Sequence, residues 1–184
     1  MRERVILDLC AGTGAWSEPY RVAGYPVVRV DLPQDVRLLE HNPLLRVHGI
    51  LAAPPCTMFS RAGARWRRTP EQMREALSIV DACLRLVFAY RPAWWALENP
   101  IGKLARYLGP PVYKCDPCDF GDPWTKRIWL WGEFKAPMKS LVTAPVYGPR
   151  PPGCNRDRTS MLSGTRRRAQ TSAAFARAFF EANP

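Results

Sequence analysis

The sequence feature that most constrains the fold is a repeated pattern in the first half of the chain, where short apolar runs alternate with longer segments. The runs cover residues 5–9, 27–30 and 50–53, and they end at a glycine-containing turn, an acidic residue and two prolines, respectively. Short β-rich runs separated by helix-length segments are typical of parallel strands joined by crossover connections. We therefore predict an α/β fold with a mostly parallel sheet and helices on both faces.

The second half of the chain adds one long helix, two strands and a terminal helix. Apolar residues recur at helical spacing over residues 70–90, and Thr69 is a suitable N-cap before the proline at the first helical position. Residues 94–97 and 128–131 are predicted to be strands, and the tail from 169 to 182 is predicted to be a helix. These elements extend the same sheet and its covering layers.

The length of the chain and the distribution of residue types along it together predict one domain. A chain of 184 residues has the length of a single ordinary domain and is long enough to bury a core. Between residues 136 and 164 proline, glycine and arginine dominate and no period survives, which predicts a long loop or a small irregular insert. The sequence shows neither an internal repeat nor a low-complexity segment.

Composition excludes several classes of protein. Hydrophobic residues make up 47% of the chain, which excludes a disordered protein. No apolar run approaches the roughly 20 residues needed to cross a bilayer. Arg2, Glu3 and Arg4 lead directly into a strand-like run, which does not resemble a signal peptide. We expect a cytoplasmic protein.

The charge balance favours a polyanionic partner. Lys and Arg number 27 against 16 Asp and Glu, which gives a formal net charge of +11, and Arg dominates the surplus. A surplus of this size on one domain favours nucleic acid, because the planar guanidinium binds two phosphate oxygens at once. The alternative is a charge that serves solubility alone.

The six cysteines argue against a disulfide framework in a cytosolic chain. Cys115 and Cys118 form one C-x-x-C pair, which would suit half of a zinc site. No second pair has a similar spacing, and His41 and His48 lie far away in sequence. Ordinary buried or loop thiols are therefore the preferred interpretation, and we predict no metal.

A glycine turn follows the first predicted strand. Residues 8–14 read DLCAGTG, and glycines in this position let the backbone approach a ligand at the carboxyl end of a strand. Asp31 ends the second strand, where its carboxylate would suit ribose hydroxyls, and Asp35 would suit an adenine amino group. A tight structural turn also explains two glycines. The ordered set indicates a nucleoside-containing cofactor, either a dinucleotide or S-adenosyl-methionine.

Two further strand ends carry residues suited to chemistry. Cys56 follows two stiff prolines after the third strand, where a thiolate would be a good nucleophile if its pKa were lowered. Glu98 directly follows an apolar strand, and partial desolvation would raise its pKa and make it a proton donor. Alternatively, Cys56 is a small buried hydrophobe and Glu98 is a charge at a helix N-terminus.

Taken in order, these motifs resemble those of the DNA cytosine carbon-5 methyltransferases, most closely the short phage-type members. The resemblance runs from about residue 5 to residue 132, and the helix around residues 175–180 would supply the family's last cofactor-contacting element. The matching segments are residues 8–14, Pro54-Pro55-Cys56 with Phe59-Ser60, Glu98-Asn99, and residues 120–123 leading to Lys126-Arg127 and a strand.

The resemblance implies a Rossmann-like S-adenosyl-methionine-dependent methyltransferase fold. Residues 1–184 would form one catalytic domain, with a short Pro- and Arg-rich insert at about residues 133–165 in place of a full target-recognition domain. In this sequence the family's cofactor contacts fall on the glycine turn, the strand ends and their neighbours, namely Asp8, Cys10, Gly12, Gly14, Trp16, Asp31, Leu32, Asp35, Val36 and Pro54.

The resemblance also implies a mechanism. The Cys56 thiolate would attack carbon 6 of cytosine, which activates carbon 5 toward the methyl group, and Glu98 would hold and protonate ring nitrogen 3. Arg127, helped by Lys126, would contact the base carbonyl or the neighbouring phosphate. The target base in a duplex must then be flipped out.

The sequence departs from the family pattern at several positions. Cys10 stands where an aromatic residue is common, and Trp16 would take over part of that cofactor packing. Thr57 replaces the usual glutamine, Pro100 follows Glu98-Asn99, and residues 124–127 replace a pattern of one Gln and two Arg. These changes affect the positioning of the base more than the reaction.

Basic residues after the nucleophile and near the C-terminus are predicted to bind nucleic acid, because phosphate contacts give affinity and Trp66 would suit base stacking. They are Arg61, Arg65, Trp66, Arg67, Arg68, Lys126, Arg166 and Arg167. Little sequence remains for target recognition, so we expect a relaxed target, a homodimer or an accessory recognition protein. The alternatives are a methyltransferase acting on a free pyrimidine nucleotide such as dCMP, and a non-catalytic nucleic-acid-binding relative.

Overall fold

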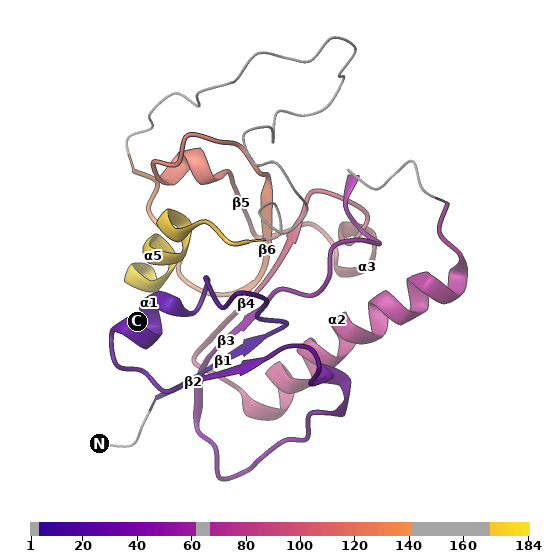
Figure 1. Cartoon of the computed structure of the whole chain (residues 1–184), viewed down its shortest axis with the longest axis horizontal. Coiled ribbons are helices and arrows are strands. Elements are labelled where there is room, and N and C mark those ends of the chain that lie inside the picture. Colours follow the sequence, from indigo (N-terminus) through magenta and orange to yellow (C-terminus); the bar gives the residue numbers. More distant parts are fainter. Residues whose placement is uncertain (1–3, 62–66, 141–169) are drawn as a thin grey trace.

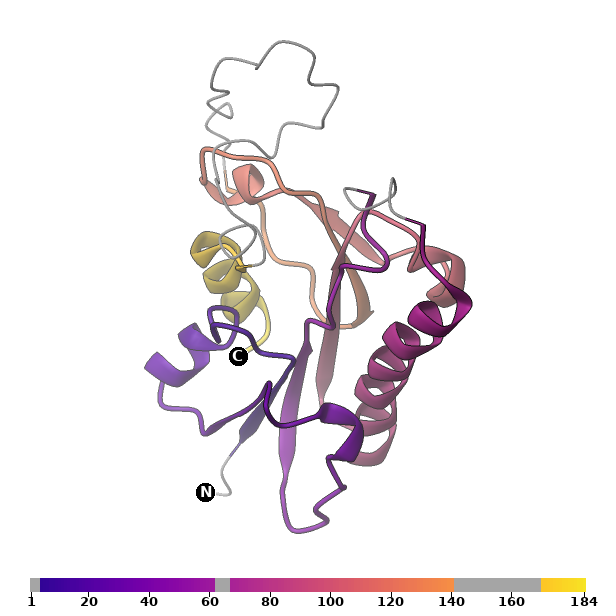
Figure 2. The same cartoon turned by 45° about the vertical axis from the view of Figure 1, so that its right-hand side comes forward.

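The computed structural model describes residues 4–61, 67–140 and 170–184. Their core is a six-stranded sheet with the order β2-β1-β3-β4-β6-β5. Figure 2 shows this sheet between two helical layers, with α1 and α5 on one side and α2 on the other. The predicted α/β class with helices on both faces is therefore confirmed for the described residues.

The sheet is mixed. Strands β2, β1, β3 and β4 run parallel, whereas β6 is antiparallel to both of its neighbours, β4 and β5 (Figure 1). The strand bounds are β1 Val5–Leu9, β2 Val27–Val30, β3 Val47–Ala52, β4 Trp94–Pro100, β5 Tyr113–Cys115 and β6 Ile128–Glu133.

The predicted strands are all present, and the corrections concern their ends. Glu98 does not follow the fourth strand but lies inside β4, because β6 pairs with the strand beyond that point and matches Glu98 to Leu130. Strand β5 has only three residues and was not predicted. It pairs only with β6, so no sequence period of its own marks it.

The long helix α2 spans Pro70–Tyr90, as predicted. Thr69 caps it, because its side chain accepts a hydrogen bond from Gln72 N while the Gln72 side chain accepts one from Thr69 N. The terminal helix starts later than predicted, at Ala173, because Ser172 accepts a hydrogen bond from Phe175 N and acts as the N-cap. The other helical elements are α1 Glu18–Val22, α3 Ala105–Leu108, α5 Ala173–Ala182, η1 Val36–Leu38 and η3 Pro117–Phe120.

The two faces of the sheet bury different side chains. The layer between the sheet and α2 is mostly aliphatic and includes Leu7 and Ile50 from the sheet and Leu86 from α2. The opposite face packs aromatic rings against α1 and α5, as when Phe179 contacts Trp94. Alternation along the central strands sends consecutive residues to opposite layers. Within the described residues, no helix is both long and apolar enough to span a bilayer.

Candidate functional site

The glycine turn lies at the carboxyl end of β1 and has an unusual backbone. Cys10, Gly12 and Gly14 all have positive φ angles, of 55°, 54° and 70°. The turn is closed by hydrogen bonds from Ala11 N to Val30 O (3.1 Å) and from Gly14 N to Ala11 O (2.8 Å). A Cβ atom at Gly12 would meet nothing within 4 Å, so a ligand can approach the backbone closely at that residue.

Gly14 lies against Arg29 of β2. A Cβ atom at Gly14 would lie 2.4 Å from the Arg29 guanidinium carbon. That guanidinium donates hydrogen bonds to Gly14 O (3.3 Å) and Ser17 Oγ (3.2 Å) and forms an ion pair with Glu18 (2.9 Å). Arg29 therefore fixes the turn to β2 and α1, a role that sequence analysis missed because alternation along β2 does not reveal its partner.

Asp8 is a buried carboxylate beside this turn. Only 1% of the residue is exposed, and its Oδ2 has no hydrogen-bond partner among the described residues. Burial raises its pKa to about 6, against the opposing effects of Ser17 and Arg29. A buried acceptor of this kind fits a ligand that brings hydrogen-bond donors or a positive charge.

The second predicted acid, Asp31, lies exposed just after β2, as does Leu32. Val36 is buried in the aliphatic core and anchors η1. Asp35 is the N-cap of η1, and both of its carboxylate oxygens accept hydrogen bonds from Arg37 (2.5–3.0 Å). The neighbouring Arg37 keeps the pKa of Asp35 below its ordinary value.

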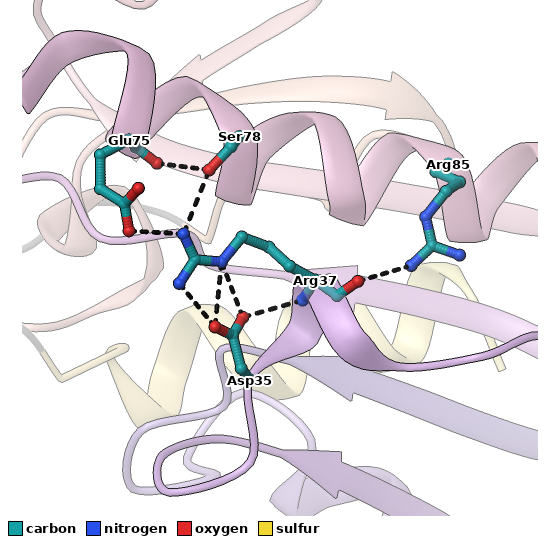
Figure 3. Close-up of polar contacts among 5 residues, drawn as sticks. All are labelled: Asp35, Arg37, Glu75, Ser78 and Arg85. Carbon is teal, nitrogen blue, oxygen red and sulfur yellow. Dashed lines mark hydrogen bonds and ion pairs between the residues drawn. The ribbon is translucent and has the colours of Figure 1, made fainter. Parts of the chain in front are cut away.

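Figure 3 shows how this segment is tied to α2. The Arg37 guanidinium bridges Asp35 to Glu75 and also donates to Ser78 Oγ (3.3 Å). Arg85 donates to the backbone carbonyl of Arg37 (3.4 Å) and to that of Leu39 (2.8 Å). The side chain of Asp35 thus has a fixed position, but its oxygens are already engaged.

Two predicted cofactor residues point into the protein. Cys10 is half-buried and packs against the aliphatic core. Its thiol forms a side-chain hydrogen bond with Cys83 of α2. This contact and burial raise the pKa of Cys83. Trp16 is 2% exposed and contacts Phe175 and Phe179 of α5. Direct contacts of Cys10 and Trp16 with a cofactor stay predictions.

The predicted nucleophile begins a tight turn after β3. The carbonyl of Cys56 accepts hydrogen bonds from Phe59 N (3.0 Å) and Ser60 N (2.8 Å). Before this turn, Pro54 O accepts a hydrogen bond from the buried Asn99 Nδ2 (3.0 Å), which joins the end of β3 to β4. Cys56 itself is half-buried. Asn99 was not predicted to have this role, although it directly follows Glu98.

The nucleophile turn also packs against the segment after β4. Lys103 N donates to Phe59 O (2.7 Å), and Arg61 N donates to Ile101 O (3.1 Å). A Cβ atom at Gly102 would lie 2.0 Å from Phe59 O, so only glycine permits this approach of two backbones. The position of Cys56 therefore depends on a residue far away in sequence.

Cys56, Glu98 and Lys126 form one electrostatic group. Burial and the nearby Glu98 raise the pKa of the Cys56 thiol, whereas Lys126 opposes that rise. Burial also raises the pKa of Glu98, again opposed by Lys126. Glu98 Oε1 is buried with no hydrogen-bond partner among the described residues. The strand ends thus bring together a thiol, a carboxyl group that favours its protonated form and a cation.

The cation in this group is Lys126, whereas the sequence favoured Arg127. Lys126 is half-buried, and its Nζ donates to Gln170 O (3.4 Å). Arg127 is exposed and acts electrostatically on Asp116. A direct contact of Arg127 with a substrate stays a prediction.

The predicted nucleic-acid-binding residues are only partly described. Arg61 and Arg67 are exposed, as contact with phosphate requires. Arg68 instead points inward, donating to Thr57 O (2.9 Å) and Ser60 O (3.5 Å), with its Nη1 buried and unpartnered among the described residues. Its contacts clamp the nucleophile turn. Arg65, Trp66, Arg166 and Arg167 lie outside the described residues.

The C-x-x-C pair lies in the core. Cys115 and Cys118 are both buried and free. Burial raises the pKa of both thiols. Among the described residues, no group of three or more His, Cys, Asp or Glu side chains has an arrangement that could hold a metal ion.

Two surface grooves lie beside α5. One, of about 650 Å³, lies between the glycine turn, α1 and α5 and contacts Gly14, Pro19 and Arg177. Gly14 is the only residue of the predicted cofactor set among those that line this groove. It therefore does not coincide with the predicted cofactor position near Asp31.

Comparison with known proteins finds similarity both in sequence and in structure. No protein-family model matches the chain. Over 185 aligned residues the chain is 24% identical to the type II methyltransferase M.DdeI of Desulfomicrobium norvegicum, a match that covers 76% of this chain and 43% of M.DdeI. The chain also matches the crystal structure of a candidate DNA modification methyltransferase encoded within an E. coli prophage, with a TM-score of 0.55 and 18% identity.

The structural match covers 77% of this chain and 52% of the prophage-encoded protein, so the chain spans about half the length of the relatives it matches. The chain therefore shares the fold of a protein described as a DNA modification methyltransferase and is similar in sequence to a type II methyltransferase. The Rossmann-like methyltransferase fold expected from the motifs is supported, with a sheet that is mostly but not purely parallel.

Proposed function

We propose that this protein transfers a methyl group from S-adenosyl-methionine to carbon 5 of cytosine in DNA, with Cys56 as the nucleophile. The observation that carries the proposal is the grouping of Cys56, Glu98 and Lys126. This group lies on the side of the sheet where the parallel strands have their carboxyl ends, and the glycine turn lies on the same side. The similarity in sequence to a type II methyltransferase and in fold to a candidate DNA modification methyltransferase supports the substrate class.

The residues around the glycine turn suit S-adenosyl-methionine. The open backbone at Gly12 permits close approach, the unpartnered Asp8 Oδ2 suits a donor or cationic group, and the exposed Asp31 carboxylate suits ribose hydroxyls. Pro54 lies between this turn and the nucleophile, because the neighbouring Ala53 N donates to Leu9 O (2.9 Å). When bound, S-adenosyl-methionine would supply an electrophilic methyl group.

The protein's own groups would act on the cytosine ring. The Cys56 thiolate would bond to carbon 6 and so make carbon 5 nucleophilic. Glu98 would donate a proton to ring nitrogen 3, a role that its raised pKa supports because the carboxyl group keeps its proton to higher pH. After methyl transfer, a water molecule or base removes the carbon-5 proton, and the bond to Cys56 breaks.

The basic surface would hold the phosphate backbone. Arg61 and Arg67 are exposed on either side of the undescribed residues 62–66, next to the nucleophile turn. Phosphate contacts give affinity with little sequence information, so binding should weaken steeply with salt. The chain's formal net charge of +11 supports the same type of partner.

The test is transfer of a radiolabelled methyl group to duplex DNA, single-stranded DNA and dCMP in parallel. We expect label in DNA as 5-methylcytosine, and we expect Cys56→Ala to abolish it. Cys118→Ala is the matched control, because it removes a buried thiol distant in sequence from the nucleophile turn.

Each other outcome changes the proposal in a defined way. Label in dCMP alone would assign the protein to nucleotide modification instead. Label in adenine, or in cytosine of the Cys56→Ala variant, would remove Cys56 from the mechanism. Salt-dependent DNA binding without methyl transfer would favour a non-catalytic binding protein.

A further inference from the structure

We propose that the Lys126 ammonium group stabilises the Cys56 thiolate and that the segment leading into α5 holds this ammonium group in place. The inference rests on the proposed role of Cys56 as the nucleophile. It adds a positioning device built from the segment that leads into α5.

The sheet register brings Lys126 to the nucleophile. Lys126 lies two residues before β6, and β6 runs antiparallel to β4 with Ile128 matched to Pro100. Beyond that pair, Ile101 N donates to Arg127 O (3.4 Å), which continues the pairing past the strand ends. The segment carrying Lys126 therefore lies beside the residues just after β4, where Gly102 forms a β-bridge with Ser60 of the nucleophile turn.

The last helix fixes the same segment at two points. Lys126 Nζ donates to Gln170 O (3.4 Å), three residues before the start of α5. Ser172, the N-cap of α5, donates to Asp122 Oδ2 through a short hydrogen bond. Because Asp122 and Lys126 flank one loop, both contacts restrict where the ammonium group lies.

Few charged groups face Cys56 within the described residues. Glu98 from β4 raises the pKa of the thiol, and Lys126 lowers it. Arg68, from the turn before α2, binds carbonyls of the nucleophile turn, while Arg127 lies toward Asp116. Among the described side chains, Lys126 is thus the cation that lowers the pKa of the thiol, against the effects of burial and Glu98.

The experiment measures alkylation of Cys56 by iodoacetamide at a series of pH values, without DNA or S-adenosyl-methionine. The thiolate sulfur bonds to the carbon of the reagent and iodide leaves, so the rate follows the thiolate fraction. Trypsin releases residues 47–61 as one peptide, in which Cys56 is the sole cysteine, and mass spectrometry then follows this site alone.

We expect Lys126→Met to slow alkylation about three- to tenfold at neutral pH and to move the pH profile toward higher pH. Lys126→Arg should restore most of the rate because it keeps the positive charge. Asp122→Ala should slow alkylation in the same direction but less, since it removes only one of the two anchors. Lys135→Met is the matched control, because Lys135 is exposed and bonds to Asn183 through its backbone.

The outcomes separate this inference from the proposed function. If Lys126→Met leaves the alkylation profile unchanged, the inference is overturned, whatever happens to methyl transfer. A uniform drop at all pH values, without a shift of the profile, would assign Lys126 a purely structural role and also overturn it. If the profile shifts but Cys56→Ala still methylates DNA, the local inference stands and the proposed mechanism fails.

Discussion

The candidate site has a cofactor half and a catalytic half, and both lie at the carboxyl ends of the parallel strands. Different parts of the chain hold the two halves in place. The cofactor half is local, because the glycine turn at residues 8–14 is fixed by Arg29 and Ser17, which follow within one strand–helix–strand unit. The catalytic half is assembled from distant segments, with Cys56 positioned by Asn99 and Gly102. A local motif can be predicted from the sequence, whereas an arrangement of residues from distant segments can be recognised only in the folded structure.

The two halves also differ in how well they should tolerate substitutions. In the cofactor half, the group that lies against Gly14 is the Arg29 side chain, which can move when a neighbour changes. In the catalytic half, the closest approach is between two backbones, at Gly102 and Phe59. Changes of similar size should therefore be tolerated better at the glycine turn than at the nucleophile turn.

The largest effect is expected from Gly102→Ala. The added Cβ atom would lie 2.0 Å from Phe59 O and 2.7 Å from its carbonyl carbon, so the two backbones must separate. We expect a loss of about 3 kcal/mol or more in the free energy of unfolding, at the upper end of overpacking costs. Urea unfolding measures this loss. Methyl transfer, measured as activity, should fall more than the affinity for S-adenosyl-methionine, measured by calorimetric titration.

Gly109→Ala is the control for this prediction. It also adds a methyl group to a glycine, one with φ of +78°, but its Cβ atom would meet nothing within 4 Å. It should therefore lower stability through backbone strain and leave the alkylation rate of Cys56 unchanged. Equal effects of Gly102→Ala and Gly109→Ala on Cys56 would contradict the close-approach argument.

The next effect concerns the buried Asp8. Burial raises its pKa from 3.8 to about 6, so the folded protein retains a proton that the unfolded chain releases. Stability contributed by the protonated carboxyl is complete below pH 3.8 and is lost as the pH rises through about 6. At 1.36 kcal/mol for each pKa unit, that loss is about 2 to 3 kcal/mol.

Asp8→Asn should remove this dependence. From pH 4 to pH 7 the unmodified protein should lose about 2 to 3 kcal/mol of unfolding free energy that the variant does not lose. Urea unfolding of both proteins at several pH values measures this difference. Its affinity for S-adenosyl-methionine should fall, because the buried acceptor is altered. Asp31→Asn, which changes an exposed neighbouring carboxylate, is the control and should keep the pH dependence of the unmodified protein. An equal loss of that dependence in Asp31→Asn would contradict burial of Asp8 as its main cause.

These differences explain which features could be predicted from sequence. The parallel strands β1 to β4, helix α2 with its Thr69 cap and the turn at residues 8–14 have signals within a few residues of themselves. Strand β5 and the extension of β4 exist only because β6 pairs with both. Periodicity within one segment cannot reveal a partner in another segment of the chain, as β6 is for both strands.

The candidate site follows the same division. Cys56 and Glu98 could be identified because each lies near a strand end, and parallel strands bring such ends together. The association of Lys126 with them could not, because it depends on the β6 register and on Gln170. Likewise, Arg68 has the composition of a phosphate contact, and only the fold shows that it binds the carbonyls of Thr57 and Ser60.

A smaller effect is expected from Gly14→Ala. A side chain at φ of +70° costs about 1 to 2 kcal/mol, and the Arg29 guanidinium can move away from the new methyl group. Affinity for S-adenosyl-methionine should fall, while alkylation of Cys56 should not change. In a double-mutant cycle, Arg29→Ala should recover part of the loss. No recovery would show that backbone strain alone limits this position.

The smallest effect tests whether the cofactor half is as local as it looks. Arg37 forms ion pairs with Glu75 of α2 and with Asp35 (Figure 3). Glu75→Gln removes the first of these contacts and leaves the second, together with the hydrogen bond from Arg37 to Ser78 Oγ. Because these side chains are partly exposed, stability should change little, and the change should vanish at high salt. Arg37→Met removes both contacts and frees Asp35, so it should alter affinity for S-adenosyl-methionine more than Glu75→Gln does. If Glu75→Gln alone weakened affinity as strongly, α2 would be part of the cofactor half, and the division between a local and an assembled half would have to be redrawn.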